Sequence, residues 1–199
     1  MFRLAKPTQE FVDRQLAAAR SLPPAGPSLL ALDAGLKRSR LPFGFSHDRS
    51  TSVIGRGPAA FDAARHAFDQ WAQFDLGWVR VANPLTPLVR GRVVAVQART
   101  AGLWTLAMSR IIETVDTPTR FGFLYATTRM HVEEGEERFV IELDPASGQV
   151  WYLIEAVSRP RHPLARLGWP FSRAMQHRFA RDSHSHMRAV VEHARHIPS

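Results

Sequence analysis

Alternating apolar and polar positions dominate the chain from residue 76 to residue 158. Runs with this strand-like period cover residues 76–82, 90–99, 103–116, 119–129, 136–144 and 149–158. Short turn-forming segments separate the runs; Glu134-Gly135 is one of them, and 144–148 gives the clearest. Six consecutive strands with short connections predict an antiparallel meander.

Three other segments repeat apolar residues every three or four positions. Thr8 is placed to cap a short helix that ends before the proline-rich residues 23–28. A short strand at 51–54 precedes a helix that begins at Pro58 and runs to about Gln73. The last helical pattern covers 170–195, roughly 39 Å at 1.5 Å per residue, which is long enough to cross the concave face of a curved sheet.

The last helix is predicted to have one apolar side and one basic side. Phe171, Met175, Phe179 and Val190 fall on the apolar side, and His186 falls between them. The opposite side carries the basic residues Arg173, His177, Arg181, His184 and Arg188. We therefore expect one side against the sheet and the other in solvent.

Size and composition are typical of one globular domain. The chain has 199 residues, 45% of them hydrophobic, and contains no cysteine. No apolar run approaches the roughly 20 residues of a membrane helix, and the first residues lack a signal-peptide pattern. These features predict a cytoplasmic protein without a transmembrane segment.

The net charge of +8 is distributed unevenly. Residues 1–57 carry +5, residues 58–156 carry −3 and residues 157–199 carry +6. A basic last helix favours contact with nucleic acid through Arg173, Arg181 and Arg188. The same excess of arginine is also typical of a chain encoded by a GC-rich genome, so both interpretations stay open.

A set of short motifs resembles one known family. The motifs are Val53-Ile54-Gly55-Arg56-Gly57 with Phe61, Ala64 and Trp71; Gly77-Trp78-Val79; residues 121–125; His131 with Glu133, 135–137 and Phe139; and Ser158-Arg159-Pro160 with Gln176. Together they resemble the DUF1990 family of bacterial and plant proteins over roughly residues 42–190.

The resemblance implies an α+β helix-grip fold. In that superfamily, which includes START-type lipid carriers and aromatase/cyclases, a curved antiparallel sheet wraps a long C-terminal helix and often leaves a hydrophobic cavity. We expect about seven strands, an N-terminal helical arm with a proline-rich segment at 1–41, and one helix-grip domain at 42–199. A shared fold does not transfer an activity.

Arg110 and Glu155 are the first polar candidates. Strand alternation places Arg110 in a row of large apolar side chains, and a buried arginine needs a carboxylate or a ligand anion. Glu155 shares one face of the last strand with Trp151 and Leu153, and it is a candidate partner for Arg110. Three interpretations remain: a structural ion pair, an outward face, or an arginine that anchors an acidic ligand.

Tyr125, His131 and Glu136 are further candidates. Tyr125 offers a hydroxyl to a cavity or packs in the core. His131 precedes four glutamates, an arrangement that suits acid/base chemistry or a solvated acidic turn around Gly135. The family resemblance adds weight to His131 and Glu136 without giving them roles.

His186 is expected to face the sheet, either as a packed histidine or as an acid/base in the cavity. No pair of helical histidines has the spacing of a metal site, and there is no nucleophile elbow, phosphate-binding loop or dinucleotide fingerprint. We expect neither a metal nor a cofactor.

The sequence therefore predicts a protein that binds a small, mostly hydrophobic molecule or lipid between the sheet and the last helix. Two alternatives remain. One is a cyclase, aromatase or hydrolase that uses Tyr125, His131 or His186; the other is a nucleic-acid-binding or assembly protein that uses the basic helix.

Overall fold

A computed structural model describes residues 2–37, 40–131, 133–161 and 169–194. Seven strands form one antiparallel sheet in the order β4-β10-β9-β8-β7-β6-β5, and β1 (Phe2–Arg3) pairs with β7. Their bounds are β4 (Ser46–Arg56), β5 (Val79–Val81), β6 (Val93–Thr100), β7 (Leu103–Thr117), β8 (Arg120–Thr127), β9 (Glu133–Leu143) and β10 (Gln149–Pro160). The predicted meander is confirmed, and β4 extends it beyond β10.

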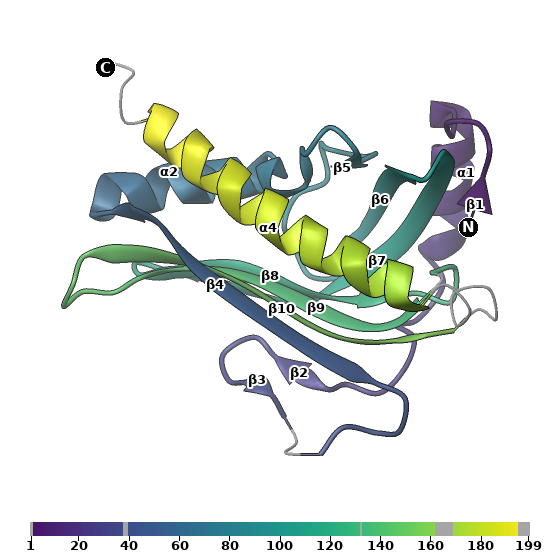
Figure 1. Ribbon diagram of the computed structural model, residues 1–199, viewed down its shortest axis with the longest axis horizontal. Helices are drawn as coiled ribbons and strands as arrows, with labels where there is room; N and C mark the ends of the chain where they lie inside the picture. Colours follow the sequence, from purple (N-terminus) through teal and green to yellow (C-terminus); the bar gives the residue numbers. More distant parts are fainter. Residues whose placement is uncertain (1, 38–39, 132, 162–168, 195–199) are drawn as a thin grey trace.

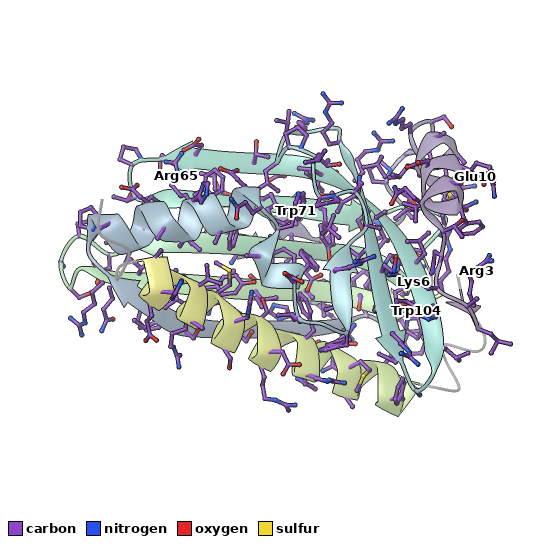
Figure 2. All side chains as sticks on the ribbon, turned by 90° about the horizontal axis from the view of Figure 1, so that it is seen from above. Arg3, Lys6, Glu10, Arg65, Trp71 and Trp104 are labelled. Carbon is purple, nitrogen blue, oxygen red and sulfur yellow. The ribbon has the colours of Figure 1, made fainter. Side chains whose placement is uncertain are left out.

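The helices cover the concave face of this sheet. Figure 1 shows α2 (Pro58–Asp69) and the long α4 (Trp169–Ala194) on one side of the sheet, and Figure 2 shows them side by side from above. This is the helix-grip arrangement. Pro58 occupies the first turn of α2, as expected, and Gly57 precedes it at φ 81°, a backbone conformation that favours glycine.

An aromatic core fills one half of the concave face. Phe61 and Phe68 of α2, with Trp71 just after it, pack on Phe123 and Tyr152 of the sheet. Ring centroids lie 5.5 Å apart for Phe68 and Tyr152 and 5.3 Å apart for Trp71 and Phe123, both edge-on. A short helical turn, η1 (Ala72–Phe74), continues from this core and brings Phe74 toward α4.

Residues 2–37 pack on the sheet. Thr8 caps α1 (Gln9–Ala19) as expected, and Val12 and Leu16 of α1 pack against β6 and β7. The hairpin of β2 (Leu30–Ala31) and β3 (Gly35–Leu36) lies under the convex face, opposite α4 (Figure 1). The predicted arm is thus part of the packed molecule, and the division at residue 42 stays a prediction.

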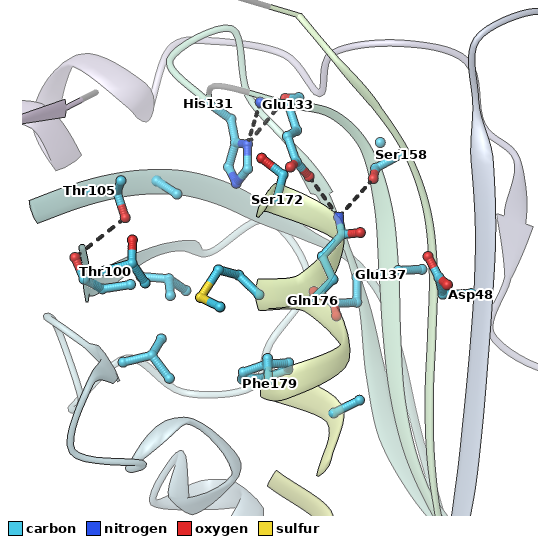
Figure 3. A pocket seen from close by; sticks show the side chains of 18 of the residues that line it. Asp48, Thr100, Thr105, His131, Glu133, Glu137, Ser158, Ser172, Gln176 and Phe179 are labelled. Carbon is cyan, nitrogen blue, oxygen red and sulfur yellow. Dashed lines mark hydrogen bonds between the residues drawn. The ribbon is translucent and has the colours of Figure 1, made fainter. Parts of the chain in front are cut away.

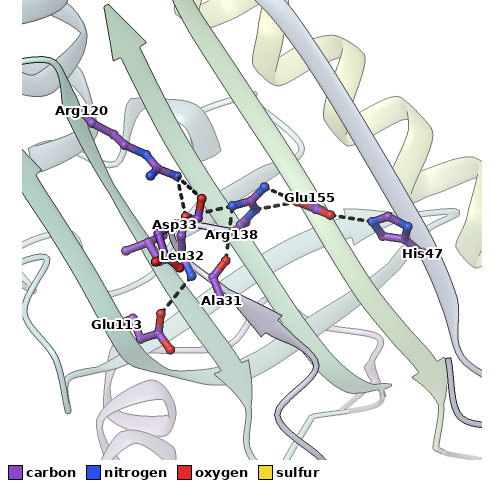
Figure 4. Close-up of polar contacts among 8 residues, drawn as sticks. All are labelled: Ala31, Leu32, Asp33, His47, Glu113, Arg120, Arg138 and Glu155. Carbon is purple, nitrogen blue, oxygen red and sulfur yellow. Dashed lines mark hydrogen bonds and ion pairs between the residues drawn. The ribbon is translucent and has the colours of Figure 1, made fainter. Parts of the chain in front are cut away.

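Buried charges hold the β2–β3 hairpin against the convex face (Figure 4). Arg138 of β9 pairs with Glu155 of β10, with 2.5 Å between Nη2 and Oε2, and donates to the carbonyl of Leu32. His47 lies 2.6 Å from the other oxygen of Glu155. Because both members of the Arg138–Glu155 pair are buried, each depends on the other.

Candidate functional site

A cavity of about 640 Å³ lies between the sheet and the N-terminal half of α4. The concave face is lined there by small side chains, which leave the space that aromatic rings fill elsewhere: Ala98, Thr105, Ala107, Gly135, Ala156 and Ser158. Phe74 and Phe179, with ring centroids 5.2 Å apart, separate the cavity from the aromatic core. The lining is mainly apolar and its polar groups gather on one side, a composition typical of small-molecule sites.

The cavity reaches solvent between the β6–β7 turn and the start of α4. Leu103 and Phe171 both line it, and 38% and 48% of their surfaces are exposed. Ala101 and Gly102 make the turn with φ values of 49° and 79°. An apolar molecule entering here meets apolar side chains first.

A carboxyl group and a phenol form the deepest polar pair. Tyr125 of β8 and Glu137 of β9 are cross-strand neighbours, and the Tyr125 hydroxyl donates to Glu137 Oε2 at 2.5 Å. Burial raises the pKa of Glu137 to about 7, and the nearby Glu133 and Asp48 add to that rise. Burial and Glu137 also raise the pKa of Tyr125 well above its usual value. Near neutral pH, Glu137 therefore exchanges a proton while Tyr125 keeps its own.

A second polar group lies where β9 begins (Figure 3). Gln176 of α4 donates to Glu133 Oε2 at 3.1 Å and to Ser158 Oγ at 3.2 Å. The backbone N–H of Glu133 donates to His131 Nδ1 at 3.0 Å. Burial lowers the pKa of His131 to about 4, so the ring is neutral at pH 7, and burial raises the pKa of Glu133. This side of the cavity thus gathers one neutral histidine and two carboxyl groups.

Arg173 is the nearby cation among the described residues of α4. Its Nη2 lies 2.7 Å from Asp48 Oδ1, and its Nη1 contacts the other oxygen of Asp48. It also lowers the pKa of Glu133 through its charge. Because the guanidinium is held on Asp48 by both nitrogens, its charge is largely balanced there.

Three of the predicted candidates, Tyr125, His131 and Glu136, border the cavity, although the carboxyl group of Glu136 is bonded on the other side of β9. Arg110 is elsewhere, and the expectation that it enters the cavity is wrong. It donates to the carbonyls of Ala19, Arg20 and Leu22 at the end of α1, and to Gly91. Its partners are main-chain oxygens, which remove the need for a carboxylate or a ligand anion.

Glu136 and Glu155 point to the convex face. Glu136 accepts the N–H groups of Leu29 and Leu30 at 2.7 and 2.6 Å. The expected partnership of Glu155 with Arg110 is wrong, because β8 and β9 separate their strands and Arg138 lies beside Glu155. The side chains of both glutamates hold the N-terminal segment to the sheet.

The acidic stretch is a strand, so the predicted turn at Glu134-Gly135 is wrong. β9 begins at Glu133, and Gly135 pairs with Ser158 of β10. The outward glutamates are buried because each has a partner: Arg159 for Glu134, and the N–H groups described above for Glu136. The inward ones, Glu133 and Glu137, enter the cavity lining.

The predicted apolar side of α4 faces the sheet in part: Phe171, Met175 and Phe179 line the cavity, and Val190 packs on the aromatic core. Among the described side chains of α4 the buried ones are Ser183, Met187 and Val191, while His186 is half-buried and does not line the cavity. His184, expected in solvent, lies between Ser50 and Ser52 of β4, with its ring nitrogens 2.9 and 2.8 Å from their hydroxyls. The helix crosses β4, so the side of it that the sequence marks as polar is partly covered.

Glu137 and Gln176 are the cavity residues that the sequence reasoning did not select. Reading Gly135 as a strand residue would have found Glu137, because it then shares a face with Phe139 and Ile141. Gln176 stands one turn before Phe179 and gives no comparable signal. Within the described ranges no group of three or more His, Asp or Glu side chains is arranged to hold a metal ion, and no helix is long and apolar enough to cross a membrane.

Comparisons with known proteins add a family and a fold. A family model described as a domain of unknown function, DUF1990, matches residues 31–186. A UPF0548 protein of Dictyostelium discoideum is 35% identical over 167 residues, 77% of each chain. A UPF0548 protein of Deinococcus radiodurans is 33% identical over 193 residues, 91% of this chain and 94% of the relative.

Two solved structures are similar in fold. The di-domain ARO/CYC BexL from the BE-7585A biosynthetic pathway has a TM-score of 0.53 at 17% identity, over 79% of this chain and 52% of that one. The di-domain ARO/CYC StfQ from the steffimycin biosynthetic pathway has a TM-score of 0.52 at 9% identity, over 77% and 52%. The chain spans about half of each di-domain protein, and the likeness confirms the helix-grip fold.

Proposed function

This chain belongs to the DUF1990 family, and from that premise we propose that it binds a small, mostly hydrophobic molecule in the cavity under α4. The carrying observation is the cavity itself: about 640 Å³, mainly apolar, with its polar groups on one side and exposed apolar residues at its opening. Pockets that hold small molecules commonly range from about 300 to 1,000 Å³ and have this composition.

The lining suits a ligand with an apolar body and one polar end. The body would lie against Phe74, Phe179 and the small residues of β6 and β7. The polar end would face Tyr125, Glu137 and His131. A cytoplasmic location for such a binding protein stays a prediction.

Filling the cavity tests this function. Ala156 lies on the concave face beside Glu137, so Ala156→Leu places three extra carbon atoms in the space. The measurement is titration with a neutral, environment-sensitive naphthalene probe. We expect saturable binding to the natural chain and an affinity at least about tenfold lower in Ala156→Leu. A tenfold change in Kd corresponds to roughly 1.4 kcal/mol of binding free energy.

A matched control is Ala146→Leu, which adds the same volume to the exposed turn between β9 and β10. It should bind the probe like the natural chain. Equal binding by all three proteins would contradict the proposed function, since the probe would then be bound outside the cavity.

An enzyme is the second candidate, and one arrangement favours it. Glu137, whose pKa burial raises to about 7, hydrogen-bonds the Tyr125 hydroxyl and lies on the same cavity as the neutral His131. A carboxyl group that titrates near the working pH is suited to general acid/base chemistry. The similarity to the solved ARO/CYC proteins supports this candidate through the fold alone, because a shared fold does not assign catalytic residues.

The enzyme candidate predicts a loss of turnover without a loss of binding. For any reaction found with a cavity ligand, Glu137→Gln should lower kcat by about 100-fold or more, the usual range for a general acid or base. Probe affinity should stay within about threefold. Unchanged kcat would remove Glu137 from the chemistry.

The nucleic-acid alternative draws less support. Of its three arginines, Arg173 is paired with Asp48 and Arg188 donates to the carbonyl of Val53 at 3.2 Å, while Arg181 is exposed. A gel-shift assay at rising salt tests it, because phosphate contacts weaken steeply as salt increases.

A further inference from the structure

The polar side of the cavity holds more hydrogen-bond acceptors than donors. Glu137 receives one hydrogen bond, from Tyr125, at Oε2, and no described residue donates to its Oε1. Glu133 receives Gln176 at Oε2, and the Ser158 hydroxyl also stabilises its ionised form. Oε1 of Glu137 is not a buried orphan, so it opens onto accessible space. Ionised carboxyl groups are acceptors only, so a ligand that carries donors would complete the hydrogen bonding of Glu137.

The charged groups around the cavity also favour a ligand that carries hydrogen-bond donors. Asp48, Glu133 and Glu137 reach this space from β4 and β9, and Arg173 is committed to Asp48. Neither Glu133 nor Glu137 forms an ion pair with any described residue. Arg49 also borders the cavity, but its side chain is exposed and alternates to the convex face of β4. Among the residues that the structure describes, carboxyl groups therefore outnumber cations at the polar side of the cavity.

Aromatic rings surround the same region. Tyr125 and Phe179 line the cavity, and both pack on the buried Phe139, with ring centroids 5.7 and 6.2 Å from its own. The faces of aromatic rings attract cations, and so do carboxylates in a partly desolvated site. Both features favour a positively charged group over a negatively charged one.

We propose that the ligand is an amphiphilic amine whose ammonium group donates to Glu137 and Glu133 while its hydrocarbon part fills the apolar side of the cavity. This inference rests on the proposed binding function and names the chemical class of its ligand. An ammonium group offers three donors and one positive charge, which match the open oxygen of Glu137, the neighbouring Glu133 and the excess of carboxyl groups.

Binding must then couple to the protonation of Glu137. The ionisable groups that act on Glu137 are Tyr125 on β8, Tyr152 on β10, Glu133 on its own strand and Asp48 on β4, and Arg173 on α4 is bonded to that Asp48. Burial raises the pKa of Glu137 to about 7, so below that pH the carboxyl group is neutral and attracts an ammonium group less. Amine binding should strengthen as pH rises through 7 and should release a proton.

Three probe competitors of equal chain length separate the outcomes. Decylamine, decanol and decanoate are titrated against the neutral naphthalene probe at pH 8. We expect decylamine to bind about 10- to 100-fold more tightly than decanol, the range for a hydrogen bond to a charged group, and decanoate to bind more weakly than decanol. The preference for decylamine should shrink at pH 5.5, where decylamine itself keeps its charge.

Two variants assign the effect to the carboxyl groups. Glu137→Gln should reduce the preference for decylamine to within about threefold and leave decanol affinity unchanged. Glu142→Gln is the matched control: Glu142 is on the same strand, is exposed, and loses the same charge outside the cavity. Glu133→Gln provides a second test of the same kind if Glu137→Gln fails to fold.

Equal binding of the three competitors, or tightest binding of decanoate, would overturn the amine proposal and leave the binding function in place. A preference for decylamine that Glu137→Gln and Glu133→Gln both keep would overturn it as well. Failure of all three competitors to displace the probe, with equal probe binding in Ala156→Leu, would remove the binding function together with the inference.

Discussion

Glu137→Gln is expected to stabilise the protein at alkaline pH and to change its stability little in mild acid. The ionised carboxyl group is disfavoured by burial, which raises its pKa from 4.5 to about 7 in the folded chain. Each pKa unit corresponds to about 1.4 kcal/mol, so the folded state loses about 3 kcal/mol once Glu137 is ionised.

The sign follows from which state binds the proton more tightly. Glu137 has the higher pKa in the folded chain, so its contribution to stability is greatest below about pH 4.5 and falls as pH rises from there to about 7. Glutamine cannot ionise and avoids this loss. The variant should therefore exceed the natural chain by less than about 1 kcal/mol near pH 5 and by about 3 kcal/mol above pH 8.

The assay is urea unfolding of the natural chain, Glu137→Gln and Glu142→Gln at several values between pH 5 and pH 9. The contribution of Glu133 is present in all three proteins and cancels to first order. Glu142→Gln should stay within about 0.5 kcal/mol of the natural chain throughout, as surface substitutions do. A stability difference for Glu137→Gln that does not change with pH would refute the buried, titrating carboxyl group.

Further substitutions test other parts of the structure. Gly135→Ala should destabilise the protein by at least about 2 kcal/mol, because a Cβ there would lie 2.1 Å from the carbonyl oxygen of Val157; thermal unfolding measures it. Arg138→Met should cost about 3–5 kcal/mol in urea unfolding by leaving Glu155 buried and unpaired, and Arg138→Met/Glu155→Leu should regain much of it. Arg110→Met should lower the unfolding temperature, because Arg110 donates to main-chain carbonyls at the end of α1 and at Gly91. Probe affinity should stay unchanged. Weaker probe binding by this variant would show that Arg110 contributes to the binding site.

The sheet could be predicted because its signals are local. The strands from β5 to β10 were predicted from period-two alternation, and the turn at 144–148 forms as expected, with Gly148 at φ 67°, whereas the turn predicted at Glu134-Gly135 does not form. Thr8 and Pro58 gave the helix starts for the same reason. The strands β1, β2 and β3 have two residues each, too few for a period. β1 forms through long-range pairing with β7, whereas β2 and β3 pair with each other in a short hairpin.

The environment of individual side chains was harder to predict, because it depends on which other segments cover each face of the sheet. Arg110 shares a face with Leu106 and Met108, as alternation requires, but α1 covers that face and makes it a second core. The glutamates around Gly135 resemble a solvated turn in sequence, and only the partners brought by 29–30 and Arg159 allow them to be buried. The face that α4 turns to the sheet likewise depends on the position of β4.

Whether a ligand occupies the cavity under α4 is decided by native mass spectrometry of the protein from its own host, compared with Ala156→Leu purified in the same way. We expect a reproducible small bound mass on the natural chain, lost under denaturing conditions and strongly reduced in Ala156→Leu. The mass should belong to an amphiphilic molecule. The same bound mass at equal occupancy on both proteins would contradict a ligand in the cavity under α4.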